Sequence, residues 1–210
     1  NVAEIASAVL SALESADILF VDDGSPDGTG ERIDALRAEE SRIHVLHRSG
    51  KLGLGTAYLE GFRWGLDHGY DYLIEMDADF SHDPKYLSDL VGCAERGADM
   101  VVGSRYVEGG GTVNWGIGRQ IISRAGGLYA RTILGLGVSD PTAGFVCYRR
   151  QTLEAIDLDA VHSNGYSFQR EMKYRVARAG MRIEEVPNVI EDRRVGPSKR
   201  SRAILTEGQL

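Results

Sequence analysis

The sequence predicts an α/β fold in which a mostly parallel central sheet carries helices on both faces. Four segments that are apolar nearly throughout alternate with segments of helical periodicity over about residues 1–105. Strands of that kind belong to parallel sheets that are covered on both sides. Beyond residue 105 the alternation breaks, which indicates a less regular second half. A chain of 210 residues fits a single domain, 1–210.

The elements of the first half follow in order. Apolar residues at helical spacing predict a helix through about residue 14, and the strand "DILFV" then leads to Asp22 and Asp23. A turn cluster comes next, in which Thr29 is a candidate cap for the following helix. After the strand "RIHVL", the Gly-rich loop "HRSGKLGLG" leads into a helix over about residues 55–68.

The strand "YDYLIEM" runs into two carboxylates, Asp77 and Asp79. Asp83 at an N-cap position, followed by Pro84, marks the start of a helix that reaches about residue 95. The strand "DMVVGSR" closes the first half. For the second half the sequence predicts a loop to residue 116, a helix over 117–134, a turn and strand in "DPTAGFVCYR", a helix at about 166–179, and two short strands, "RIEEV" and "NVIED".

Charge and composition exclude several classes of protein. The net charge of -7 is uneven, because residues 1–90 hold 18 acidic and 7 basic groups, net -11, and the remainder is net +4. This argues against general nucleic-acid binding and allows a local anion site in the second half. No apolar run approaches the roughly 18 residues that cross a bilayer. Cys93 and Cys147 lack metal-type spacing and are expected to be reduced core residues of a cytoplasmic protein.

Polar groups collect where predicted strands end, which is where open parallel sheets bind ligands. The groups expected to be neighbours there are Asp22 with Asp23, Asp77 with Asp79, and Ser104 with Arg105. Two carboxylates at Asp77 and Asp79 suit Mg²⁺ or Mn²⁺, although acidic residues also occur near the positive end of a helix. Asp22 and Asp23 either bind a ribose or base, support the metal, or belong to an ordinary turn.

Other motifs are open to two interpretations. The loop around Lys51 lacks the Gly-Lys-Ser/Thr ending of a P-loop, so a P-loop nucleotide triphosphatase is unexpected. The arginines at 105, 119, 124 and 131 could hold a second anion or be solvated. The basic stretch "RRVGPSKRSR" could close over an anion, contact acidic lipid head groups, or be a solvated loop. The five histidines form no zinc-type cluster and are expected mostly at the surface.

Taken together and in order, these segments resemble the polyprenol-phosphate (dolichol-phosphate) mannose synthases, inverting glycosyltransferases of GT-A fold. The resemblance covers nearly the whole chain and rests on "VDDGSPDGT", "GKLGLGTAYLEGF", "EMDADFSHDP", "GSRYVEGGG", "NWGIGRQIISR", "DPTAGF" and "DRRVGPSK". It implies a nucleotide-binding half over about 1–105 and an acceptor-binding half over about 106–210.

The resemblance also implies an activity. Mannose would pass from GDP-mannose to a polyprenyl phosphate, with inversion, at the cytoplasmic face of the cell membrane. The enzyme would need Mg²⁺ or Mn²⁺, and its attachment would be peripheral or would use a membrane-anchoring subunit or domain. The acceptor phosphate is already an anionic nucleophile, so no general base is required. Catalysis then reduces to positioning and to stabilising the charge on the leaving diphosphate.

Roles carry over by position. Asp77 and Asp79 would hold the metal and the diphosphate, while Asp22, Asp23 and Lys51 would bind the nucleotide. The residues expected at the lipid phosphate are Arg105, Arg119, Ser123, Arg193 and Lys199. Those expected around the sugar are Asp140, Gly144, Gln169 and Glu171. Catalysis itself would fall to Asp79, Arg105 and Arg119.

This chain departs from the family pattern at two places. The family normally begins with a strand ending in a Pro-x-Tyr-Asn-Glu type segment that helps to hold the nucleotide, and this sequence starts after it. Some relatives have Gln as a further metal ligand two residues after the second Asp, where this chain has Ser81. The alternatives are a polyprenyl-phosphate glucosyltransferase that uses UDP-glucose and a non-catalytic sugar-nucleotide-binding subunit.

Overall fold

The computed structural model describes residues 1–113, 115–116, 118, 126–127, 132 and 135–191, and every structural statement below is confined to them. Its α-helices are α1 (Val2–Ala12), α2 (Thr29–Glu39), α3 (Leu54–Asp67), α4 (Leu87–Glu95), α6 (Arg150–Ala155) and α7 (Gly165–Arg178). Two short 3-10 helices are η1 (Pro84–Tyr86) and η2 (Leu158–Ala160). The helix expected over 117–134 and the basic stretch from 193 fall largely or wholly outside the described residues.

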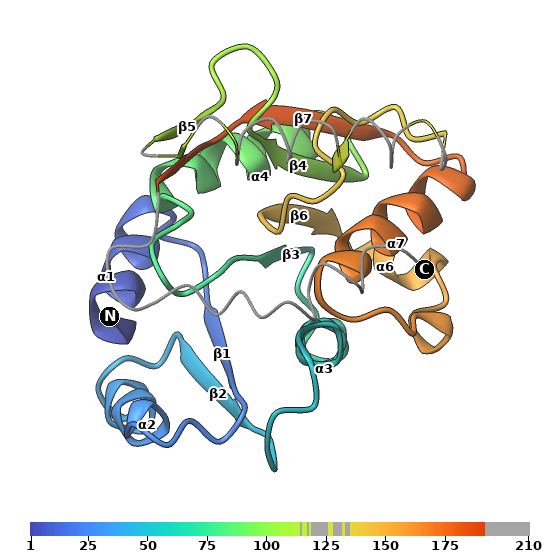
Figure 1. Ribbon diagram of the computed structural model, residues 1–210. Coiled ribbons are helices and arrows are strands. Elements are labelled where there is room, and N and C mark those ends of the chain that lie inside the picture. The colour runs from blue at the N-terminus through green and yellow to red at the C-terminus, as the bar shows by residue number, and fades with distance from the viewer. Residues whose placement is uncertain (114, 117, 119–125, 128–131, 133–134, 192–210) are drawn as a thin grey trace.

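The strands form three sheets (Figure 1). The first pairs β1 (Ile18–Asp22) with β2 (Ile43–His47) in parallel. The second has the order β3 (Tyr72–Glu75), β6 (Val146–Arg149), β4 (Met100–Ser104) and β7 (Ile183–Pro187). The third pairs β5 (Gly111–Val113) with β8 (Val189–Glu191) in parallel. The predicted α/β fold is confirmed.

One pairing differs from the expected arrangement. β6 lies antiparallel between β3 and β4, so the strand ends near Asp77 and Arg105 are not direct neighbours. β4 and β7 are parallel. A strand of four residues such as "VCYR" carries no mark of its direction in a sheet, so the sequence could predict β6 as a strand but not its orientation.

The four-stranded sheet separates two hydrophobic cores, as alternating side chains require. Met100 and Val102 of β4 enter the core that contains α3 and α7, and Val101 enters the core that contains α1 and α4. In β6, Tyr148 enters the core that contains α3 and α7, and Cys147 enters the core that contains α1 and α4. Helices therefore cover both faces of this sheet, as predicted (Figure 1).

Local signals were mostly accurate. Asp83 accepts the Lys85 N–H at 3.0 Å and caps η1, with Pro84 as its first residue, so the predicted start is confirmed. The prediction for Thr29 was wrong, because Gly28 is the N-cap and Thr29 is the first helical residue. Both cysteines are free thiols, with Cys147 buried. No helix in the described ranges is long and apolar enough to span a membrane.

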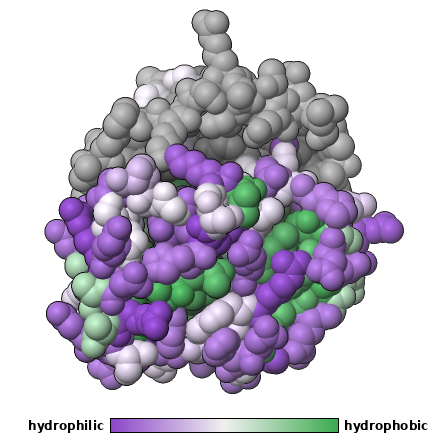
Figure 2. Space-filling view, turned by 90° about the horizontal axis from the view of Figure 1, so that it is seen from below, coloured by the Kyte–Doolittle hydropathy of each residue, from purple (hydrophilic) through white to green (hydrophobic). Residues whose placement is uncertain are grey.

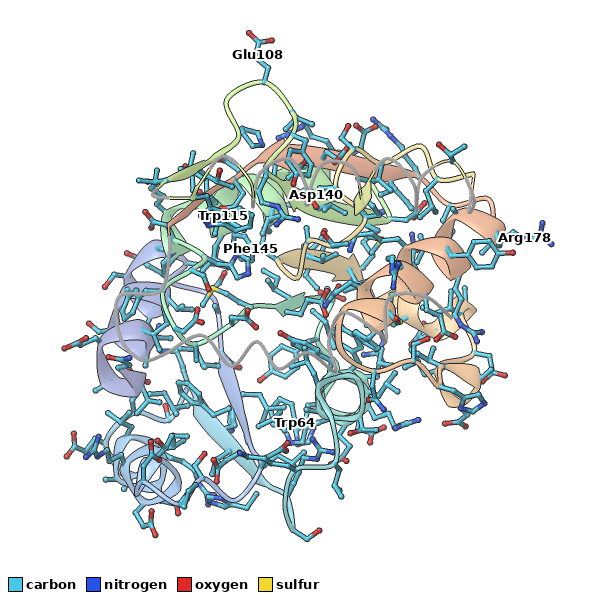
Figure 3. All side chains as sticks on the ribbon, in the orientation of Figure 1. Trp64, Glu108, Trp115, Asp140, Phe145 and Arg178 are labelled. Carbon is cyan, nitrogen blue, oxygen red and sulfur yellow. The ribbon has the colours of Figure 1, made fainter. Side chains whose placement is uncertain are left out.

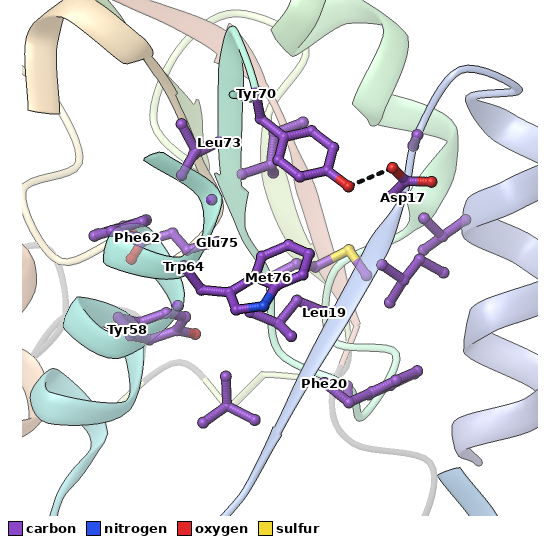
Figure 4. A pocket seen from close by; sticks show the side chains of 18 of the residues that line it. Asp17, Leu19, Phe20, Tyr58, Phe62, Trp64, Tyr70, Leu73, Glu75 and Met76 are labelled. Atoms are coloured by element: carbon purple, nitrogen blue, oxygen red, sulfur yellow. Dashed lines mark hydrogen bonds between the residues drawn. The ribbon is translucent and has the colours of Figure 1, made fainter. Parts of the chain in front are cut away.

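A mainly apolar cavity of about 380 Å³ lies between β1 and β3 (Figure 4). α1 and α3 also contribute to its wall, with Ile5 and Phe62 among the lining residues. Within the described part of the chain β1 pairs only with β2, and β3 pairs only with β6. Two strand edges without a second partner therefore border an apolar slot. On the face of the molecule that is seen from below in Figure 2, hydrophobic residues are exposed between hydrophilic ones.

A strand that is added by design before Asn1 is expected to fill this slot. A segment of about six Val, Ile and Leu residues, joined to Asn1 by a short linker, would pair with both strand edges and bury its side chains against α1 and α3. The connection through α1 to β1 would be a right-handed βαβ crossover. Each kcal/mol of net stabilisation should raise the melting temperature by about 2–4 °C. A Gly/Ser extension of equal length is the control, and equal melting temperatures for the two extended proteins would contradict the prediction.

Candidate active site at the carboxyl ends of β3 and β4

The carboxyl ends of β3 and β4 meet the turn at residues 140–145, which precedes β6. β6 is antiparallel to both neighbours, so it begins near their carboxyl ends. Val146 opposes Glu75 of β3 and Val102 of β4. The turn is therefore placed between the loop that follows β3 and Arg105, the residue that follows β4.

Arg105 forms a buried ion pair with Asp140. Its Nε donates to one carboxylate oxygen at 2.6 Å, its Nη2 donates to the other at 2.5 Å, and its backbone N–H adds a bond of 3.1 Å. Nη2 also donates to Thr142 Oγ1 at 2.8 Å. The rings of Tyr106 and Trp115 lie 5.2 and 5.6 Å from the guanidinium carbon. This bidentate contact fixes the guanidinium plane against the turn.

The strand β7 supports Asp140 from the other side. Glu185 of β7 accepts the N–H groups of Ser139 and Asp140 at 2.7 and 3.0 Å. Burial favours the neutral carboxyl group, but the hydrogen bonds and charge of Arg105 outweigh it and hold the pKa of Asp140 below its ordinary value. Asp140 is therefore ionised at neutral pH, and the ion pair persists. Figure 3 shows Asp140, Phe145 and Trp115 in one region near β4 and β6.

The loop after β3 holds its two carboxylates in a constrained turn. Tyr58 on α3 donates to Asp77 Oδ1 at 3.2 Å. Asp79 accepts the Ser81 N–H at 3.0 Å and also the Ser81 hydroxyl. Phe80 has a φ of 63°, a conformation that is costly for a residue with a side chain. Ser81 is thus engaged with Asp79, while Asp77 keeps 40% of its side chain exposed.

His82 is buried in this loop, unlike the surface position that was expected for most of the histidines. Only 4% of the residue is exposed, and its ring stacks on Phe145 with 5.0 Å between centroids. His82 Nε2 lies 3.9 Å from Asp77 Oδ2, and its Nδ1 lies 3.4 Å from Asn188 Nδ2. Burial is the main cause of a lowered pKa for His82, although the charges of Asp77 and Asp79 act in the opposite direction. The loop and the turn are therefore packed together through a neutral imidazole.

The strand end of β1 forms a second polar cluster. Asp22 accepts the Ser25 N–H at 3.3 Å. Asp23 pairs with the buried Arg48 at 2.7 Å, and Arg48 also donates to Thr56 Oγ1 at 2.5 Å. These contacts tie the end of β1 to the Gly-rich loop and to α3. Lys51, in that loop, is exposed.

The residues expected around the sugar are only partly brought together. Gly144 lies against the buried Gln169 of α7, since a Cβ on Gly144 would meet Gln169 Nε2 at 3.5 Å. Glu171 instead accepts the Ser163 N–H at 3.0 Å and pairs with Arg175 at 2.7 Å. Glu171 is therefore engaged with a different part of the chain from the turn at 140–145.

Two buried titratable side chains, Glu75 and Lys173, escaped the sequence analysis. Glu75 of β3 accepts the Tyr148 hydroxyl at 3.3 Å, and burial raises its pKa to about 8. Lys173 of α7 donates to Ala143 O at 2.8 Å, and burial lowers its pKa to about 8. The single acidic residue in the otherwise apolar "YLIEM" was the available signal for this pair. Lys173 anchors the turn at 140–145 to α7.

The carboxylates of Asp77 and Asp79 provide the hard oxygen donors that Mg²⁺ and Mn²⁺ take. The described residues contain no group of three acidic, histidine or cysteine side chains placed to hold a metal ion alone. A divalent cation at this site would therefore need further oxygen ligands, such as those of a diphosphate. The remaining predicted anion ligands, Arg119, Ser123, Arg193 and Lys199, lie outside the described residues.

Comparison with known proteins gives three kinds of match. The family model for glycosyl transferase family 2 matches residues 2–157. An undecaprenyl-phosphate mannosyltransferase of Micrococcus luteus is 55% identical over 196 residues, which is 93% of this chain and 80% of the relative. A polyprenol monophosphomannose synthase of Mycolicibacterium smegmatis is 48% identical over 211 residues, which is 100% of this chain and 80% of the relative.

Solved structures support the fold alone. Glucosyl-3-phosphoglycerate synthase of Mycobacterium tuberculosis, in complex with Mn²⁺ and UDP-glucose, gives a TM-score of 0.64 at 20% identity, covering 96% of this chain and 69% of that one. The same enzyme with phosphoglyceric acid gives 0.58 at 23% identity, and this chain spans 61% of its length. The match to the phosphoglyceric acid complex covers 85% of this chain.

Removal of Asp140 tests the buried ion pair. Asp140→Ala removes the carboxylate that the buried Arg105 contacts with two guanidinium nitrogens, and loss of one partner of a buried pair costs about 3–5 kcal/mol of unfolding free energy. Asp159→Ala is the matched control, because Asp159 pairs with Arg63 at 2.6 Å while 87% of its side chain is exposed. That exposed pair should contribute about 1 kcal/mol or less. Urea unfolding measures both, and equal losses would contradict the importance of the Arg105–Asp140 pair.

Proposed function

The chain belongs to glycosyl transferase family 2, and from that premise we propose that it transfers mannose from GDP-mannose to a polyprenyl phosphate with inversion. The observation that carries this proposal is the 55% and 48% identity to two enzymes named for mannose transfer to polyprenyl phosphates. Both names favour mannose over glucose from UDP-glucose. The intact carboxylates of the loop after β3 favour an enzyme over a non-catalytic binding subunit.

In the proposed reaction a phosphate oxygen of the acceptor attacks the anomeric carbon of mannose, and GDP leaves from the opposite face. The nucleophile carries its own negative charge, so no side chain has to remove a proton. Asp77 and Asp79 would hold a divalent cation, which supplies neutralising charge to the leaving diphosphate when bound. The turn at Phe80, with a φ of 63°, lies between Asp79 and Ser81, and the Ser81 N–H bonds to the Asp79 carboxylate.

The proposed acceptor site lies on the other side of the turn at 140–145. Arg105 would attract the lipid phosphate while Asp140 holds its guanidinium in place. Arg119, Ser123, Arg193 and Lys199 complete the proposed anion site. This places positive charge opposite the cation, so that the attacking and leaving groups can lie in line.

The donor would occupy the first half of the chain. Asp22, Asp23 and Lys51 are proposed to contact the nucleoside and diphosphate, in the nucleotide-binding half at about 1–105. Asp140, Gly144 and Gln169 are proposed to contact the sugar. Glu171 is proposed to support α7, the helix that carries Gln169, and not to contact the sugar itself. The acceptor-binding half spans about 106–210, and the enzyme would act peripherally at the cytoplasmic face of the membrane.

Turnover is the first test of this function. With Mn²⁺ or Mg²⁺, GDP-mannose and a short polyprenyl phosphate, the protein should form the lipid-linked mannose. Asp79→Ala should lower the rate at least about 100-fold, because the leaving diphosphate loses its charge stabilisation. Asp83→Ala, in the same loop, removes the cap of η1 and the ion pair with Lys85, and should cost about 1 kcal/mol of stability without a comparable loss of rate. Equal rates for Asp79→Ala and wild type would remove the role assigned to Asp79.

Nucleotide choice is the second test. A ligand that binds only the folded protein raises its stability by mass action. With Mn²⁺ present, GDP at one hundred times its Kd should stabilise the protein by about 2.7 kcal/mol, and UDP at the same concentration should stabilise it less. Thermal unfolding followed by fluorescence measures the difference. A larger shift with UDP would support the glucosyltransferase instead.

A further inference from the structure

His82 occupies the space between the two halves of the proposed site. Its ring is held on one face by Phe145 of the turn at 140–145, and its Nδ1 faces Asn188, between β7 and β8. Its Nε2 faces the carboxylate of Asp77. Three separate elements thus fix the direction of one imidazole nitrogen, and this residue had no role in the function argued above.

The amide of Asn188 indicates which nitrogen carries the proton. As placed, Asn188 Nδ2 faces His82 Nδ1, and Asn188 Oδ1 is buried with no hydrogen-bond partner among the residues that the structure describes. A buried amide oxygen without a partner is costly, and the two ends of an amide are distinguished only by their hydrogen bonds. Rotation of the amide by 180° directs Oδ1 to His82 Nδ1, which then donates its N–H. The lone pair of Nε2 is then directed towards Asp77.

The distance between Nε2 and Asp77 Oδ2 suits a shared cation. At 3.9 Å it is too long for a direct hydrogen bond. Two ligands that each lie about 2.1 Å from one ion can be separated by up to about 4.2 Å. A histidine that binds a metal through one nitrogen commonly donates its other N–H to a protein oxygen, which is the arrangement that the rotated Asn188 provides.

We propose that His82 Nε2 is a ligand of the divalent cation beside Asp77. This inference rests on the proposed function, which places a cation at that carboxylate. Ser81 is not required as a ligand, because its N–H and hydroxyl both bond to Asp79. Since no three ligand side chains converge among the described residues, the cation takes further ligands from the donor diphosphate. Binding of Mn²⁺ should therefore tighten when GDP is present.

A nitrogen ligand also affects the choice of metal. Mg²⁺ prefers oxygen ligands in strict octahedral geometry, whereas imidazole favours transition metals. Replacement of His82 by a residue without a ring nitrogen should therefore weaken Mn²⁺ binding more than Mg²⁺ binding. His82→Phe retains a flat ring to stack on Phe145 and removes only the nitrogens.

Electron spin-echo spectroscopy of bound Mn²⁺ tests the proposal directly. Wild-type protein with MnCl₂ and GDP should show modulation from an imidazole ¹⁴N, and histidine labelled with ¹⁵N should change it. His82→Phe should abolish this modulation and weaken Mn²⁺ binding by about tenfold or more. His44→Phe is the matched control, because His44 of β2 contacts Trp64, with the two rings tilted by 45°, and its loss should leave the modulation unchanged.

The outcomes separate this inference from the function on which it rests. Mn²⁺ that binds with GDP in the wild type but gives no ¹⁴N modulation would overturn the role of His82 alone. Absence of Mn²⁺ binding, with or without GDP, would overturn the cation site and the role of His82 together. The wild-type spectrum with labelled histidine decides the question even if His82→Phe fails to fold.

Discussion

The antiparallel placement of β6 between β3 and β4 is the constraint on which the site depends. A parallel strand at this position would begin at the opposite edge of the sheet, far from the ends of its neighbours. Because β6 runs the other way, the turn before it arrives where β3 and β4 end. Asp140, Phe145 and Ala143 of that turn then contact Arg105, His82 and Lys173, respectively. One strand direction thereby joins the loop of the carboxylates to the arginine.

The site is held by buried charges that stabilise one another. Arg105, Asp140 and Glu185 connect β4, the turn and β7 through short hydrogen bonds in a region with little solvent. Burial of charge is costly, and only complete pairing offsets that cost. This arrangement therefore gives a rigid frame for the turn rather than a large gain in stability. Rigid support is what positioning of two phosphate groups requires, since small displacements of a reacting oxygen lower the rate steeply.

The sequence predicted most of what depends on local chemistry. Apolar runs identified β1 to β4, and Asp83 with Pro84 marked the start of η1. Strand-end position indicated Asp77 and Asp79 as site residues, and their role as ligands stays a prediction. Contacts between distant segments could not be predicted in this way. The direction of β6, the pairing of Arg105 with Asp140 and the burial of His82 all depend on tertiary packing. Spacing along the chain carries no signal for them.

The central claim is that the donor nucleotide and its cation bind at the carboxyl ends of the strands, beside Asp77 and Asp79. The cavity of about 380 Å³ between β1 and β3 is mainly apolar, and although Asp77 is among its lining residues, no lysine or arginine of the described ranges is. Crystals soaked with GDP and MnCl₂ and measured at a wavelength with strong Mn anomalous scattering would locate the ion. The account predicts one anomalous peak beside the Asp77 carboxylate, with the diphosphate of GDP next to it. A peak, or GDP density, among the apolar lining residues of that cavity, such as Ile5 and Phe62, and away from the Asp77 carboxylate would contradict it.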